Sequence, residues 1–267
     1  GNGALRSQSV TGVESALNVT TTGDQLYGGA TTLNGSRYQT GGGRFQIDGS
    51  TILGGAGDIL VTTGTGNAVF NGALNGARSL RIDSSGVTRF NGIVGGDNAL
   101  TALTTDAGGS TAIGGKASAI TVRDVLSWGE TTALERDVTM NAREVGFTGS
   151  VWSAGNTPVA LGVNGTTSVT FKNLVGVRDE ANRNGADPSQ ALRNLTVSGG
   201  KIIIDTTATP NGMIIRTAGN LQAGAGRQSY AAALDITGGT VLFDTANAGA
   251  LPADDGTGRG LATNPLP

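Results

Sequence analysis

The chain has 267 residues, a formal net charge of −2, a hydrophobic content of 37% and an aromatic content of only 4%. Such a composition does not fill a wide, round core, but it does fill a narrow interior in which small apolar side chains stack on one another. The 46 glycines exclude a mainly helical protein, because glycine costs about 1 kcal/mol per helix position relative to alanine. Basic residues are scattered singly, which argues against a nucleic-acid groove or a polybasic membrane patch.

The sequence contains no cysteine and no histidine. Disulfides, thiol nucleophiles and thiolate metal sites are therefore excluded, and the commonest general base and transition-metal ligand are missing. We expect no metal site and no cofactor. No apolar run approaches the roughly 20 residues of a membrane-spanning helix, so we also expect no direct membrane insertion.

Residues 17–120 consist of short apolar stretches that end in Gly, Asn, Asp or Ser. Within residues 44–48 apolar and polar side chains alternate, which predicts a strand with Phe45 and Ile47 facing a core. Glycine at the end of each stretch is typical of tight turns between short strands.

An apolar residue followed by a small or polar residue and glycine recurs in this region, as in Phe70-Asn71-Gly72 and Phe90-Asn91-Gly92. The step from Phe70 to Phe90 is 20 residues, and the step from Phe90 to Ile113 is 23. Such steps suit one rung, or full turn, of a β-solenoid, in which neighbouring rungs complete each other's core. We predict an all-β parallel β-helix of about 20–23 residues per rung, with Phe70, Phe90 and Ile113 in one interior ladder. Asn71 and Asn91 then form either an amide ladder or exposed turns.

The stretch from residue 122 to residue 160 is less regular and contains both tryptophans. Either an outward loop or a change of cross-section explains the irregularity. Trp128 and Trp152 have two interpretations as well. They line a carbohydrate-binding surface, because a sugar ring stacks well on indole, or they pack beneath a loop.

Residues 178–193 lack apolar alternation and hold five charges before Pro188. Asp187 followed by Pro188 is a helix-start signal, so we expect a surface insertion with one helical turn that projects from the solenoid. The candidate residues for contact with a ligand or partner are Trp128, Trp152, Arg178, Asp179, Glu180 and Arg183.

Residues 195–205 match residues 234–244 at an offset of 39, near twice the shorter step. Each copy predicts a strand, a Gly-Gly corner and a second strand, with Ile214 and Ile215 supplying an intervening rung. We expect a single shaft over residues 1–246 and a cap, linker or frayed tail over residues 247–267. The N-terminal residues show the same pattern of residue types as the middle of the chain, so we expect a fragment or processed product of a longer chain.

A carboxylate pair is the one serious catalytic option. Asp83 and Asp106 are 23 residues apart and fall on adjacent rungs, and glycoside hydrolysis uses two carboxylates. Each, however, stands where a strand meets its turn, a position that favours Asp for turn chemistry alone. We therefore expect no catalytic residues and no enzyme, with a carbohydrate-active β-helix enzyme as the alternative.

Three segments, Leu17–Ala30, Phe90–Gly96 and Ala99–Gly109, resemble repeat units of filamentous-haemagglutinin-like adhesins. The resemblance is good over about residues 13–120 and is limited to the general pattern of residue types over residues 120–245. It implies a right-handed parallel β-helix exported by two-partner secretion or as an autotransporter passenger.

The function that this resemblance implies is a structural, adhesive segment of a large secreted bacterial surface protein, located outside the cell. Its partners would be the surfaces of host or neighbouring cells, with glycans as candidate ligands. The alternatives are the enzyme above and a self-assembling extracellular fibre or surface-layer subunit, associated through the ends or sides of the solenoid.

Overall fold

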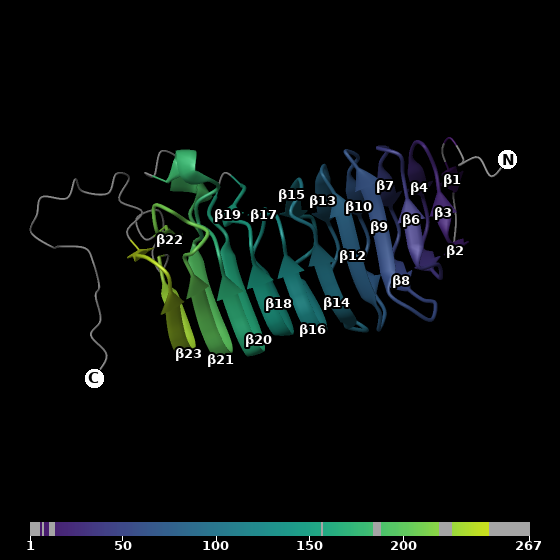
Figure 1. The fold of residues 1–267 in the computed structure, drawn as a ribbon. Coiled ribbons are helices and arrows are strands. Elements are labelled where there is room, and N and C mark those ends of the chain that lie inside the picture. Colours follow the sequence, from purple (N-terminus) through teal and green to yellow (C-terminus); the bar gives the residue numbers. More distant parts are fainter. Residues whose placement is uncertain are drawn as a thin grey trace, which may run out of the picture.

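The computed structural model describes residues 6, 8–10, 14–155, 157–183, 188–218 and 226–245. Over these residues the chain coils into an elongated solenoid, with the first strands at one end and the last at the other (Figure 1). All hydrogen-bonded strand pairs in the described part are parallel, and each connects one rung to the next. The predicted all-β parallel β-solenoid is therefore confirmed.

The strands form three faces. The first face is an eight-stranded sheet of β1 (Gln8–Val10), β4 (Gln25–Tyr27), β7 (Phe45–Ile47), β10 (Ala68–Phe70), β13 (Val87–Phe90), β15 (Ser110–Ile113), β17 (Thr131–Leu134) and β19 (Val151–Ser153). Isolated bridges from Val151 to Val175 and from Val175 to Ile215 continue this face. It ends in the two-stranded sheet of β22 (Met213–Arg216) and β24 (Val241–Asp244).

The second face is short and the third is the longest. The second face contains β2 (Glu14–Ala16), β5 (Thr31–Leu33), β8 (Thr51–Leu53) and β11 (Leu74–Asn75). The third is a ten-stranded sheet of β3 (Val19–Thr20), β6 (Arg37–Gln39), β9 (Ile59–Gly64), β12 (Ser79–Ser84), β14 (Leu100–Thr105), β16 (Ala119–Trp128), β18 (Val138–Phe147), β20 (Ala160–Phe171), β21 (Asn194–Asp205) and β23 (Gln228–Thr237).

The cross-section changes where the second face ends. Isolated bridges join Leu74 to Val94 and Val94 to Ile120, and Ile120 belongs to β16 of the third face. From β16 onward, strands of 10 to 12 residues on the third face replace the shorter strands that preceded them. Of the two explanations for the irregular stretch after residue 122, the change of cross-section is the one observed.

Stacked glycines form two corners of the solenoid. At one corner, a Cβ on Gly72 would lie 2.2 Å from the carbonyl oxygen of Gly49 in the preceding rung. At the other, a Cβ on Gly66 would lie 2.0 Å from the carbonyl oxygen of Gly43. We call this second corner the glycine column, and its members are Gly23, Gly43, Gly66, Gly86, Gly109 and Gly149. The recurring glycines of the sequence are thus required by close contact between successive backbones.

The predicted interior ladder is present. Phe70 is in register with Phe90, and Phe90 with Ile113. All three side chains are buried. The rings of Phe70 and Phe90 stack with centroids 5.6 Å apart and planes 9° apart. Stacking of this kind adds about 0.5–1.5 kcal/mol to the free energy gained by burying each ring.

An amide ladder on the outer surface runs beside this interior ladder of Phe70, Phe90 and Ile113. Asn91 Nδ2 donates a 2.8 Å hydrogen bond to Asn71 Oδ1, and Asn71 Nδ2 donates one of 2.7 Å to Asp48 Oδ1. The side chains therefore bond across three successive rungs, and the ladder interpretation of these asparagines is confirmed.

The predicted equivalence of residues 195–205 and 234–244 is wrong. Leu234 is in register with Ile202, so β21 and β23 are neighbouring strands with no rung between them. Gly199 and Gly200 lie inside the continuous strand β21, at an irregularity in the register between Ser198 and Lys201. Two glycines suit both a bulge within a strand and a corner, which explains why the sequence match misled.

In the described part of the insertion, residues 178–183 and 188–193, the chain forms two single 3-10 turns, η1 (Glu180–Asn182) and η2 (Pro188–Gln190). The helical turn expected at Pro188 is therefore present. The end of the insertion does not project, however, because Ala191 and Leu192 are fully buried and Leu192 joins the main core. Residues 247–267, expected to form a cap, linker or tail, lie outside the described residues.

Candidate functional site

Trp128 lies in the interior. Its side chain is 0% exposed. Its ring meets that of Phe90 edge-on, with centroids 6.0 Å apart, and its Nε1 points at Met140 Sδ at 3.3 Å. The prediction that Trp128 contributes to a binding surface is wrong, because the ring fills the core where the third-face strands lengthen and leaves no face for a ligand.

Trp152, on β19, is half-buried and lies against the start of the insertion. The guanidinium carbon of Arg178 is 5.8 Å from the centre of the indole ring, a cation–π arrangement. Arg178 Nε also donates a 3.0 Å hydrogen bond to Asp179 Oδ2. The structure therefore brings three of the predicted residues together, with the indole partly covered by the arginine.

Asp179 and Arg183 hold the insertion in place. Asp179 is the N-cap of η1. Its Oδ1 accepts hydrogen bonds from the backbone N–H and the side-chain amide of Asn182. Burial raises the pKa of Asp179, but hydrogen bonds from Arg178 and Asn182 outweigh it and the pKa lies below its usual value.

Arg183 has only 15% of its side chain exposed. It donates hydrogen bonds to the carbonyl oxygens of Gly212, at 2.9 Å, and Asn211. It also pairs with Glu180 at 3.1 Å. Arg183 is therefore a clamp between the insertion and the turn before β22. We call Trp152, Arg178, Asp179, Glu180 and Arg183 the insertion cluster.

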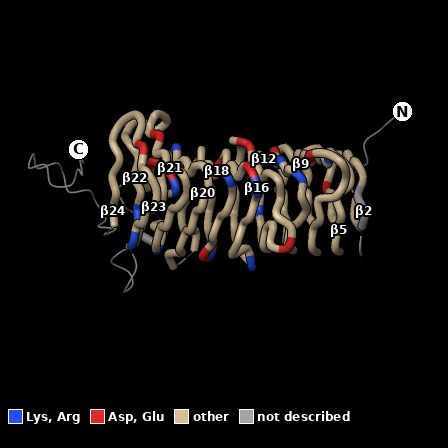
Figure 2. The backbone as a smooth tube through the Cα atoms, turned by 90° about the horizontal axis from the view of Figure 1, so that it is seen from below, with Lys and Arg blue, Asp and Glu red and all other residues tan. Residues whose placement is uncertain are grey.

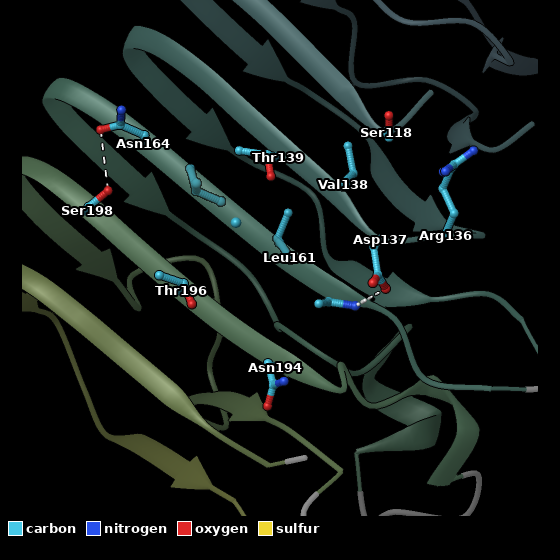
Figure 3. Close-up of a pocket in the computed structure, with 13 residues that line it drawn as sticks. Ser118, Arg136, Asp137, Val138, Thr139, Leu161, Asn164, Asn194, Thr196 and Ser198 are labelled. Atoms are coloured by element: carbon cyan, nitrogen blue, oxygen red, sulfur yellow. Dashed lines mark hydrogen bonds between the residues drawn. The ribbon is translucent and has the colours of Figure 1, made fainter. Parts of the chain in front are cut away.

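A shallow groove of about 520 Å³ runs across the outer side of β18, β20 and β21 (Figure 3). Its floor is Gly162, which lies in register between Thr139 and Thr196 and leaves a hollow between their side chains. The lining residues are Ser118, Arg136, Asp137, Val138, Thr139, Ala160, Leu161, Gly162, Val163, Asn164, Asn194, Thr196 and Ser198.

An ion pair links the groove to the insertion. Asp137 Oδ2 pairs with Arg193, the last residue of the insertion. Asp137 Oδ1 accepts a 2.9 Å hydrogen bond from the backbone N–H of Ala160. The other polar lining groups are mainly hydroxyls and amides, which donate and accept hydrogen bonds without a net charge. Asp137 is the one carboxylate among the lining residues, so the groove holds no acid–base pair.

Asp83 and Asp106 lie on adjacent rungs, as predicted. Asp106 Oδ1 accepts a 3.1 Å hydrogen bond from the backbone N–H of Ser84. Asp83 pairs with Arg81 of its own strand at 2.7 Å. Asp83 is thus paired with a cation of its own strand, and Asp106 with a backbone N–H of the preceding rung.

Two carboxylates that the sequence did not single out have stronger surroundings. Glu135 forms a bidentate pair with Arg89, with atoms 2.6 and 2.9 Å apart, across Gly114 in the rung between them. Hydrogen bonding to Arg89 holds the pKa of Glu135 below its usual value. Glu130 is buried at the end of the rung that contains β16. Glu130 stands out because it occupies a position in the glycine column, and that position can be recognised only when the register of the rungs is known.

Comparison with protein-family models, with curated proteins and with solved structures finds no match to this chain. Basic and acidic positions are scattered along the shaft (Figure 2). Within the described ranges no group of three or more acidic side chains is placed to hold a metal ion. The helices in the same ranges are too short and polar to cross a bilayer.

Proposed function

We propose that this chain is a rigid structural segment of a large secreted bacterial surface protein and acts outside the cell as a stalk or fibre for attachment. The observation that supports this proposal is the unbroken ten-stranded third face, whose strands pair in parallel from one end of the described shaft to the other. Each rung is hydrogen-bonded and packed against two neighbours, so the body resists bending and holds a distal region away from its base.

The insertion cluster and the groove are the proposed contact surface. Arg178, Asp179 and Glu180 keep much of their side chains exposed. The groove, which the Asp137–Arg193 ion pair links to the end of the insertion, presents hydroxyl and amide groups. Sugar hydroxyls are both donors and acceptors and match such a lining. The partners we propose are therefore surfaces of host or neighbouring cells, with their glycans as ligands.

Beads coated with the chain test this proposal. We expect them to adhere to cells or glycan-coated surfaces, and we expect Thr196→Trp, which fills the groove, to reduce adhesion at least tenfold. The matched control is Arg81→Ala, an exposed change elsewhere on the third face. Beads that adhere to no surface contradict the attachment role. Cleavage of acidic polysaccharides that is lost in Asp83→Asn or Asp106→Asn would instead establish the enzyme.

A self-associating fibre is a second candidate, favoured by the last described rung. β23 ends the order of the ten-stranded sheet, and its Leu234 and Ile236 are 36% and 45% exposed. An open parallel edge with apolar side chains pairs readily with another chain. Sedimentation that shows concentration-dependent assembly, abolished by Ile236→Lys, would support the fibre, and a monomer at all concentrations would exclude it.

A further inference from the structure

One buried carboxyl interrupts the glycine column. Ser110 is in register with Thr131, and Thr132 with Val151, so Glu130 occupies the place held by Gly109 in the rung before and Gly149 in the rung after. Glu130 is only 3% exposed. The solenoid therefore carries an ionisable side chain at a corner where the other column members have none.

The carboxyl of Glu130 points into a layer of threonine hydroxyls. Thr88, Thr111 and Thr132 are inward-facing and fully buried, and Thr88 is in register with Thr111 and Thr111 with Thr132. Thr111 Oγ1 donates a 2.5 Å hydrogen bond to Glu130 Oε1. Glu130 Oε2 and Thr88 Oγ1 are also buried, and the Thr88 hydroxyl faces the same carboxyl.

No positive charge compensates this carboxyl within the described residues. The ionisable group that faces it is Asp106, an anion at the end of β14, and the facing positions on β13 and β15 are the neutral Thr88 and Thr111. Burial is the main cause that raises the pKa of Glu130, and the charge of Asp106 adds to it, while hydrogen bonds from Thr111 and Thr88 lower it; the result is a pKa of about 8.

The protonated and ionised forms differ in the charge that the layer must hold. The hydroxyls of Thr88 and Thr111 can donate to the ionised carboxylate, and a protonated Oε2 can donate to Thr88 Oγ1, so either form can be hydrogen-bonded. The ionised form, however, is a buried charge with an anion, Asp106, beside it and no cation among the described residues that face it. Protonation therefore removes an uncompensated buried charge from the layer that joins three successive rungs.

We propose that Glu130 is a proton-dependent latch that keeps β13, β15 and β17 stacked in acid and lets this part of the shaft open as the solution becomes alkaline. The sign follows from linkage. A carboxyl with a folded pKa near 8, raised from 4.5 in the unfolded chain, contributes stability that is fully present below 4.5 and is lost as the pH rises to about 8. The most rigid shaft is therefore found in mildly acidic surroundings.

Amide hydrogen exchange of the whole chain, measured from pH 5 to pH 8, tests the latch. At each pH the exchange rate of an amide in the wild type is divided by its rate in Glu130→Gln. Base catalysis of exchange accelerates both proteins equally, so it cancels in this ratio. For β15 and β17 we expect this ratio to rise by up to about tenfold per pH unit, and for β6, at the far end of the shaft, we expect no change. Equal pH profiles for wild type and Glu130→Gln would overturn the proposal.

A second variant and a direct measurement guard against a misfolded Glu130→Gln. Glu130→Gly restores the residue of the glycine column and should also lose the pH dependence. Infrared spectroscopy of the wild-type chain should show a protonated carboxyl that persists at pH 7, where exposed carboxyls are already ionised, and that falls to about half near pH 8. The absence of a protonated carboxyl at pH 6 would overturn the proposal whatever the variants do.

Discussion

The substitution Gly66→Ala tests the packing of the glycine column. The new Cβ would lie 2.0 Å from the carbonyl oxygen of Gly43, whereas ordinary contact begins at 3.4 Å. The two rungs must therefore separate locally by about 1.4 Å. The neighbouring hydrogen bond from Phe45 N to Asn67 O, now 2.9 Å, would then exceed the range of a hydrogen bond. Overpacking of this kind costs about 3 kcal/mol.

Thermal unfolding followed by circular dichroism measures this cost. A loss of about 3 kcal/mol lowers Tm by roughly 10 °C in a domain of this size. The control is Gly57→Ala, because a Cβ on Gly57 meets nothing within 4 Å, and we expect it to change stability by less than about 1 kcal/mol. Equal Tm values for the two variants would refute the stacked-backbone explanation of the glycines.

Three other substitutions have defined outcomes. Phe90→Ala removes a buried ring from the interior ladder and should lower the free energy of unfolding in urea by about 3–5 kcal/mol. A decrease of less than about 1 kcal/mol would contradict the ladder. Asp244→Asn leaves the buried guanidinium of Arg216, now 2.8 Å from that carboxylate, without its counter-charge. It should destabilise the last rung by about 3 kcal/mol, seen as faster amide exchange in β22. Glu135→Gln should cost less than about 1 kcal/mol at neutral pH, because the pair with Arg89 is partly exposed. Since the pKa of Glu135 is lowered, its contribution is present above the ordinary glutamate pKa, and the difference between the variants should vanish as the pH falls.

The parts of the fold that depend on repeated local patterns were predictable. Phe70 and Phe90 each precede Asn and Gly, and the same three positions recur because ring, amide and glycine must all meet their copies in the next rung. The step of 20 to 23 residues follows directly from that requirement. The architecture and the register of this region could therefore be predicted from the repetition in the sequence.

The parts that depend on distant packing were not predictable. Whether Gly199-Gly200 forms a bulge or a corner is decided by the strands on either side, and the interior place of Trp128 depends on the change of cross-section at β16. In the insertion the sequence identified the charged residues, and Arg178, Asp179 and Glu180 do remain accessible. It did not reveal that Arg183 bonds to backbone carbonyls 28 and 29 residues away.

Cysteine pairs give the most direct test of the parallel stacking on which the whole account depends. The chain has no cysteine of its own, and Thr32, Ile52 and Asn75 lie in register on three successive rungs of the second face. Adjacent rungs are about 4.8 Å apart, within reach of a disulfide, whereas alternate rungs are about 9.6 Å apart and too distant. We predict that Thr32→Cys with Ile52→Cys forms an intramolecular disulfide on mild oxidation and that Thr32→Cys with Asn75→Cys does not. A disulfide in the second pair and not in the first would contradict the solenoid.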